Sequence, residues 1–172
     1  KVIANPINST KSPDITVHYA AAPERVDPAN KKWTLKNTTR VISGIDEKST
    51  EFAKDLYSTF CDNVQIVSSP EVAELAKLFE NTFRQVNIAL VNNLTKLFHD
   101  LGVNPFEVIM AASTKPYGFM PFYPNIGVGG HCIPIDPLYL IKNFADQKLD
   151  SSIIKLADEI NISMPEYFAG LL

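Results

Sequence analysis

The amino-acid sequence predicts an α+β protein that is mostly α-helical and is built on one helix of about 30 residues. The first observation behind this prediction is a continuous apolar pattern, with steps of three or four residues, from Pro70 to Leu101. The second is that the segments with strand character are short and β-branched, and all of them precede residue 68. We therefore expect a helical domain over 68–172 after a sheet-containing domain over 1–67.

The first domain is expected to contain one βαβ unit. Three short segments are predicted as strands: Ile15–Ala20, Arg40–Ser43 and Val64–Val67. Between the last two, Thr50–Phe60 has apolar residues at helical spacing, with Asp46 or Ser49 as its cap. A strand, a helix and a strand in about 28 residues predict a parallel pair of strands.

The long helix has clear signals at both ends. Ser69, Pro70 and Glu71 combine a capping hydroxyl, a proline suited to the first turn and an early acidic residue, and Gly102 is placed to end the helix. Its apolar stripe consists of Val72, Leu75, Phe79, Phe83, Val86, Leu90, Leu94 and Leu97. Further apolar residues lie on other faces, so we expect the helix to be covered on several sides, with a second copy of the chain as a natural partner.

Shorter helices should follow. Asn104 begins one that reaches about Ala112, Asp136 opens a second that reaches about Phe144, and Asp150 caps a third over Ser151–Ile162, with the helical pattern resuming beyond Pro165. Residues 113–131 are rich in proline and glycine and should form a loop. The abrupt start and end predict a fragment of a longer protein.

Composition excludes several classes of protein. The net charge of −3 argues against a nucleic-acid binder, which needs a basic surface. No run of 18 apolar residues exists, so we expect no membrane-spanning helix. The two cysteines lie far apart, which favours a reduced, cytoplasmic protein. The cysteines and the three histidines show no zinc-ligand spacing, so no metal site is expected.

The segment from Gly127 to Pro137, with the sequence GVGGHCIPIDP, is the densest candidate site. Glycines allow positive φ and close approach of the backbone, and a helix start would favour a thiolate at Cys132. The functional interpretation is a nucleophilic thiol, and the structural alternative is a buried, inert cysteine with Asp136 as a plain cap. A dyad of His131 and Cys132 is a weaker alternative, because adjacent side chains seldom point at each other.

Three other residues are candidates. Lys77 and Asn81 are one turn apart on the long helix, where together they could stabilise an oxyanion or could simply be solvated. Glu24 follows the first predicted strand, at the kind of edge where open α/β sheets bind ligands, although it could form only a surface ion pair with Arg25. No G-x-G-x-x-G sequence follows a strand, so a dinucleotide site is not predicted within this chain.

Taken in order, these segments resemble the UDP-glucose/GDP-mannose dehydrogenase family over roughly residues 17–172. The resemblance is carried by APERV (22–26), RVISGID (40–46), AELAKLFEN (73–81) and Gly127 to Leu140. The form GGHCIPIDP is similar to the branch that acts on UDP-N-acetylhexosamines. The resemblance implies a Rossmann-like NAD-binding domain whose end is the βαβ unit, a central helical domain that dimerises through the helix 70–101, and a separate UDP-binding domain.

The family resemblance also implies an activity. Members oxidise the C6 alcohol of a UDP-sugar to a carboxylate in two NAD-dependent steps, through a thiohemiacetal and a thioester on a cysteine. By resemblance, Cys132 is the nucleophile, Lys77 stabilises oxyanions, Asn81 and Asp136 orient a water, and Glu24 is a candidate base. The sugar and diphosphate would be lined by Phe122, Tyr123 and Gly129.

Two other functions stay open at this point. The chain could be a non-catalytic dimerisation domain, or a thiol hydrolase that uses Cys132 with His131. As a fragment without a glycine fingerprint, the chain alone is expected to be inactive.

Overall fold

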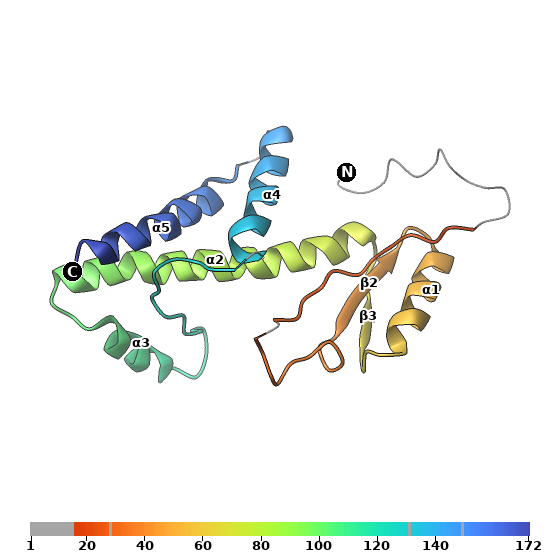
Figure 1. The fold of residues 1–172 in the computed structure, drawn as a ribbon, viewed down its shortest axis with the longest axis horizontal. Coiled ribbons are helices and arrows are strands. Elements are labelled where there is room, and N and C mark those ends of the chain that lie inside the picture. Colours follow the sequence, from red (N-terminus) through yellow and green to blue (C-terminus); the bar gives the residue numbers. More distant parts are fainter. Residues whose placement is uncertain (1–15, 28, 131, 149) are drawn as a thin grey trace. The chain divides into compact units, whose positions relative to one another are not determined.

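The computed structural model describes residues 16–27, 29–130, 132–148 and 150–172, and for Cys132 and Phe144 it describes the backbone alone. The described chain is α+β and mostly helical, as the sequence predicts, with five helices and a small sheet (Figure 1). It forms two compact units, one up to Leu75 and one from Ala76, so the division falls within the longest helix.

The sheet of the first unit has three strands in the order β1-β2-β3. Strands β2 (Arg40–Gly44) and β3 (Val64–Ile66) are parallel, which confirms the predicted βαβ unit. The predicted strand over 15–20 begins outside the described residues, and over 16–19 it is wrong: β1 is the short segment Ala20–Ala21, which pairs with β2 in the antiparallel direction. Strand propensity does not show which residues have a neighbouring strand to pair with, and in the described part of this segment these are Ala20 and Ala21.

Helix α1 (Glu47–Ser58) packs on β2, all five residues of which are buried. Asp46 is the N-cap, and its carboxylate accepts a hydrogen bond of 2.7 Å from the backbone N–H of Ser49. The helix therefore begins three residues before the predicted start at Thr50. A side chain at Gly44 would collide with the backbone of Ser49 and Thr50, so glycine permits the close approach of α1 to β2.

Helix α2 (Pro70–Asp100) has 31 residues, and both of its predicted ends are confirmed. Ser69 Oγ accepts a hydrogen bond from the N–H of Val72 at the start. At the end Gly102 has a φ of 67°, and Val103 donates to the carbonyl of Phe98, which is the pattern of a Schellman motif. The first turn of α2 belongs to the core of the first unit, where Ala73 packs with Ala21 and Val41.

The second unit packs α5 (Ser152–Ala169) along α2, with α3 (Pro105–Ser113) and α4 (Cys132–Asp146) beside it (Figure 1). The buried face of α2 is small and polar: Thr82, Gln85, Ala89, Asn92 and Thr95. Most of the predicted apolar stripe is exposed instead, and Phe79 reaches 70% exposure. Within the described residues, no helix combines the length and apolarity needed to cross a bilayer.

Two helix boundaries differ from the sequence prediction. Helix α4 begins at Cys132 rather than at Asp136: Pro134 falls in its first turn, where a missing N–H costs nothing, and the helix then runs on through Pro137. Helix α5 continues through Pro165 to Ala169, although an interior proline costs about 3 kcal/mol. Buried contacts of Ile154, Asn161 and Met164 hold that helix in place, so packing outweighs the local cost.

We expect Gly44→Ala to destabilise the first unit by about 2 kcal/mol or more, because the new methyl group meets backbone rather than a movable side chain. The fluorescence of Trp33, the one tryptophan of the chain, should report this loss in a urea titration. Gly170→Ala is a matched control, since a methyl group there makes only ordinary contacts. Equal effects of both substitutions would contradict this account.

Candidate active site

Three of the predicted site residues come together where α4 meets α2. Asn81 Nδ2 donates a hydrogen bond of 2.6 Å to Asp136 Oδ2, and Lys77 Nζ lies 4.0 Å from the same oxygen. Lys77 and Asp136 are partly covered, with side-chain exposures of 27% and 15%. One carboxylate oxygen thus faces two donors that α2 presents from successive turns, and partial burial strengthens their attraction.

The backbone places Cys132 beside this group. Cys132 is the first residue of α4, and Asp136 lies one turn further along the same helix. The unpaired N–H groups and the dipole of a helix start favour a thiolate over a thiol. The side chain of Cys132 and the whole of His131 lie outside the described residues, so the proposed Cys–His pair stays a prediction.

The glycine-rich loop before α4 lies against α5. Gly127 has a φ of 125°, and a side chain there would come within 3.0 Å of the carbonyl oxygen of Asn161. That carbonyl lacks its usual helical donor, because Pro165 stands four residues later and has no N–H. The proline in α5 and the glycine in the loop therefore face each other. Gly129, by contrast, is exposed and borders open space.

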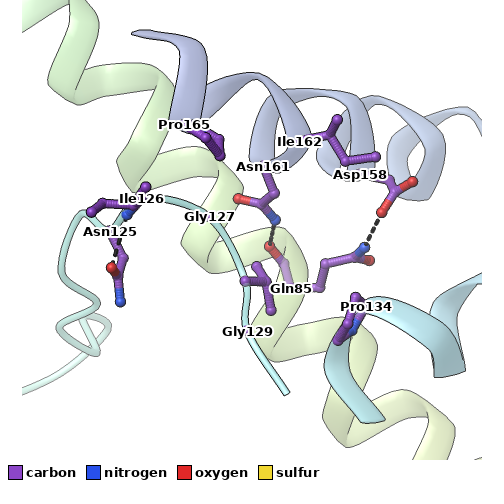
Figure 2. A pocket seen from close by; sticks show the side chains of 11 residues that line it. Gln85, Asn125, Ile126, Gly127, Gly129, Pro134, Asp158, Asn161, Ile162 and Pro165 are labelled. Carbon is purple, nitrogen blue, oxygen red and sulfur yellow. Dashed lines mark hydrogen bonds between the residues drawn. The ribbon is translucent and has the colours of Figure 1, made fainter. Parts of the chain in front are cut away.

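A pocket of about 560 Å³ lies between this loop, α2 and α5 (Figure 2). Residues 125–129 form one wall, with Gln85, Pro134 and Asp158 around them. Gln85 Nε2 donates a hydrogen bond of 3.0 Å to Asp158 Oδ1. Burial raises the pKa of Asp158, the charge of Glu159 adds to this rise, and the bond from Gln85 opposes it. The pocket thus combines polar groups of Gln85, Asp158 and Asn161 with apolar side chains from both α5 and the loop.

The buried amides next to this pocket were not predicted from the sequence. Gln85 and Asn92 of α2 and Asn161 of α5 are buried and hydrogen-bonded between elements. The sequence does carry a signal, since Asn81, Gln85 and Asn92 recur on one side of the helix at spacings of four and seven. The stronger apolar stripe on the opposite side hid that signal.

Phe122 and Tyr123 are not among the residues that line this pocket. The Phe122 ring meets Phe83 edge-on at a centroid distance of 5.8 Å, and Tyr123 stacks on Phe106 at 6.3 Å. The structure therefore places both rings on the segment that leads into the glycine-rich loop, without joining them to Asn81 and Asp136. Their role toward a sugar stays a prediction.

Glu24 belongs to the first unit, where its carboxylate forms an ion pair with the guanidinium of Arg40. Arg40 Nη2 donates to Glu24 Oε2 at 2.7 Å, and the guanidinium is buried. The N–H groups of Arg25 and Val26 donate to the other carboxylate oxygen. Burial raises the pKa of Glu24, but the hydrogen bond and charge of Arg40, together with the bond from Val26, outweigh it and leave a lowered pKa.

The strand-to-helix turn before α1 does not offer a place for the phosphates of a dinucleotide. The strand-to-helix turn that carries a glycine runs from Gly44 to Asp46, where α1 fills the space beside the glycine and a carboxylate already occupies the helix start. Such a start attracts anions only when it is free. Among the residues that the structure describes, no group of three His, Cys, Asp or Glu side chains could hold a metal ion.

Comparison with known proteins identifies the class. The model of the UDP-glucose/GDP-mannose dehydrogenase family, central domain, matches residues 71–163. The chain therefore belongs to this family, whose members are oxidoreductases that act on nucleotide sugars.

Individual relatives share the fold and part of the sequence. The chain is 42% identical over 158 residues to the UDP-N-acetyl-D-mannosamine dehydrogenase of Pyrococcus horikoshii, spanning 92% of this chain and 37% of that protein. A solved structure of the UDP-D-ManNAc dehydrogenase from that organism gives a TM-score of 0.79 at 41% identity, covering 90% of this chain and 36% of that one. A UDP-glucose dehydrogenase from Pyrobaculum islandicum gives 0.79 at 29% identity, with coverages of 90% and 36%.

The ion pair of Glu24 predicts a pH-dependent stability. A carboxyl with a lowered folded pKa stabilises the protein above its unfolded pKa, about 4.3, and this contribution disappears as the pH falls through the folded pKa. We expect Glu24→Gln to lower the urea midpoint of the first unit at pH 7, and the difference from the unmodified protein to close toward pH 3. Trp33 fluorescence measures both midpoints.

Glu51→Gln provides the control, because Glu51 is an exposed glutamate on α1 of the same unit. Its midpoint should follow that of the unmodified protein at both pH values. A Glu24→Gln deficit of the same size at pH 7 and pH 3 would argue against the ion pair.

Proposed function

We propose that this chain forms the central part of an NAD-dependent UDP-sugar 6-dehydrogenase, which oxidises the C6 alcohol of a UDP-N-acetylhexosamine to a carboxylate. The observation that supports it is the group of Asn81, Asp136 and Lys77, one helical turn from the backbone of Cys132. Such a group combines an electrostatic stabiliser, a water-orienting pair and a nucleophile at a helix start.

In the proposed reaction the Cys132 thiolate adds to the C6 aldehyde, and the new oxyanion faces the Lys77 ammonium. When bound, NAD⁺ would supply the hydride acceptor that each of the two oxidations at C6 needs. The second oxidation gives a thioester. A water oriented by Asn81 and Asp136 then attacks its carbonyl carbon, the C–S bond breaks, and the thiolate is restored with the carboxylate as product.

Other residues have supporting roles in the proposal. Phe122, Tyr123 and Gly129 would line the sugar and diphosphate. Glu24, which its neighbours keep as a carboxylate at neutral pH, is the candidate base for thioester hydrolysis. NAD would be bound outside the described residues, so the isolated chain is expected to be inactive. Cys61 is a free, buried thiol, in agreement with the expectation of a reducing compartment such as the cytoplasm.

The choice of substrate branch rests on sequence more than on fold. The two solved structures have the same TM-score, but the one named for UDP-D-ManNAc shares 41% identity with this chain and the UDP-glucose dehydrogenase 29%. The backbone of this chain thus resembles both structures equally, and the two differ in how much sequence they share with it. We therefore favour a UDP-N-acetylhexosamine over UDP-glucose.

Cys132→Ala in the full-length enzyme should abolish formation of the uronate, because no thioester can form without the sulfur atom. The measurement is the yield of carboxylate and of two NADH per sugar from a panel of UDP-sugars. Cys61→Ala is the matched control: its thiol is buried in the first unit and should be dispensable for turnover. Normal turnover by Cys132→Ala would overturn the proposed function.

We also propose that the chain forms a homodimer through the helix 70–101. The apolar stripe on α2 is exposed at Val72, Leu75, Phe79, Phe83, Leu90 and Leu97, while the opposite face is buried in the chain itself. An apolar face that runs along a 31-residue helix is larger than a monomer normally leaves in water. A second copy of the same stripe is self-complementary in polarity and would cover it.

Light scattering of the isolated chain at micromolar concentration should give the mass of a dimer. Replacing Phe79 and Leu90 together by Glu should produce a monomer, since two buried charges per protomer would oppose association. Phe52→Glu, on an exposed face of α1, should leave the dimer intact. A monomeric unmodified chain would refute the dimer.

A further inference from the structure

A chain of buried amides links α2, α5 and the loop that leads to Cys132. Asn92, fully buried on α2, donates through Nδ2 to Asn161 Oδ1 at 3.0 Å. Its Oδ1 accepts a hydrogen bond of 2.9 Å from the backbone N–H of Asn125. Asn161 in turn donates through Nδ2 to the carbonyl of Gln85 at 3.2 Å. We call Asn92, Asn161 and the N–H of Asn125 the amide clasp.

The side-chain oxygen and the side-chain nitrogen of Asn92 bond to different elements. Asn92 uses its donor on α5 and its acceptor on the loop, so turning its amide would break both bonds. Apolar residues could hold two helices together, but they would not fix the backbone N–H of a loop residue. Buried polar groups that are fully paired specify a single arrangement more strictly than apolar contacts do.

The loop is fixed at a second point two residues later. At Gly127 a Cβ would lie only 3.0 Å from the carbonyl oxygen of Asn161, in a backbone conformation with φ of 125° that side chains rarely adopt, and Pro165 Cδ lies 3.9 Å from that Cβ position. Asn161 thus contacts the loop through its backbone carbonyl as well as bonding to Asn92 through its side chain. The segment that leads from Asn125 to Cys132 is therefore fixed at its start, by contacts at Asn125 and at Gly127.

We propose that Asn92 and Asn161 are positioning residues, which hold the loop 125–130 so that the backbone of α4 begins at Cys132, one turn before Asp136. This inference rests on the proposed function, because it assigns the clasp to the same reaction. Neither residue touches the reacting atoms. Loss of the clasp would leave the loop without its anchor and would let the first turn of α4 fray, which removes the N–H groups that favour the thiolate.

The test uses the full-length enzyme with Asn92→Ala. We expect kcat to fall about tenfold to 100-fold, as for a small misplacement of a nucleophile, with the KM for the UDP-sugar changed less than threefold, about the size of a minor binding effect. The rate of Cys132 alkylation by iodoacetamide, followed by mass spectrometry over a pH series, should show a higher pH midpoint. Asn87→Ala is the matched control, because among the described residues the Asn87 amide donates to the carbonyl of Phe83 in its own helix and to no other element.

A second variant guards against a misfolded first one. Gly127→Ala keeps both side chains of the Asn92–Asn161 hydrogen bond but should displace the loop, so it should also lower kcat and raise the alkylation midpoint. Folded variants whose kcat and alkylation midpoint equal those of the unmodified enzyme would overturn the inference, even if their melting temperature fell. Turnover by Cys132→Ala would instead defeat the proposed function itself, so the two failures are distinguishable.

Discussion

The arrangement of the second unit depends on the polar side of α2. Asn81 bonds to α4, and Gln85 and Asn92 bond to α5. Asn92 also accepts a hydrogen bond from Asn125, in the loop that precedes α4. These bonds are directional, so each element has one register on the long helix, whereas apolar contacts would tolerate sliding. The candidate active site is a consequence of this registry, because its residues come from separate elements.

The same polar face explains why the apolar face of α2 is open. Helix α2 has a polar and an apolar face, and α4 and α5 bond to the polar one. Burial of polar groups is tolerated there because most of them find partners, although Thr82 Oγ1 and Gln85 Oε1 find none among the described residues. The two faces of α2 thus differ in chemistry: the polar face packs against its own chain through hydrogen bonds, and the exposed apolar face suits the hydrophobic contact of the proposed dimer.

Membership of the family and the geometry of the site support the proposed chemistry from independent directions. The sequence match covers the central domain as a whole, whereas the geometry concerns three side chains and a helix start. The spacing of four residues makes Lys77 and Asn81 candidates, and the role of Asp136 is what the resemblance to the family implies. Their convergence on one carboxylate oxygen depends on a contact over 55 residues of sequence, which spacing within α2 cannot express.

The sequence by itself determined the mostly helical class, the parallel βαβ unit and both ends of α2, because capping residues, glycine and periodicity act over a few neighbours. Local signals failed where distant contacts decided. The start of α4 at Cys132, the passage of α5 through Pro165 and the antiparallel β1 all depend on partners far along the chain. Only the tertiary structure revealed that the buried face of α2 is its polar one, since periodicity indicates where apolar residues lie and not what covers them.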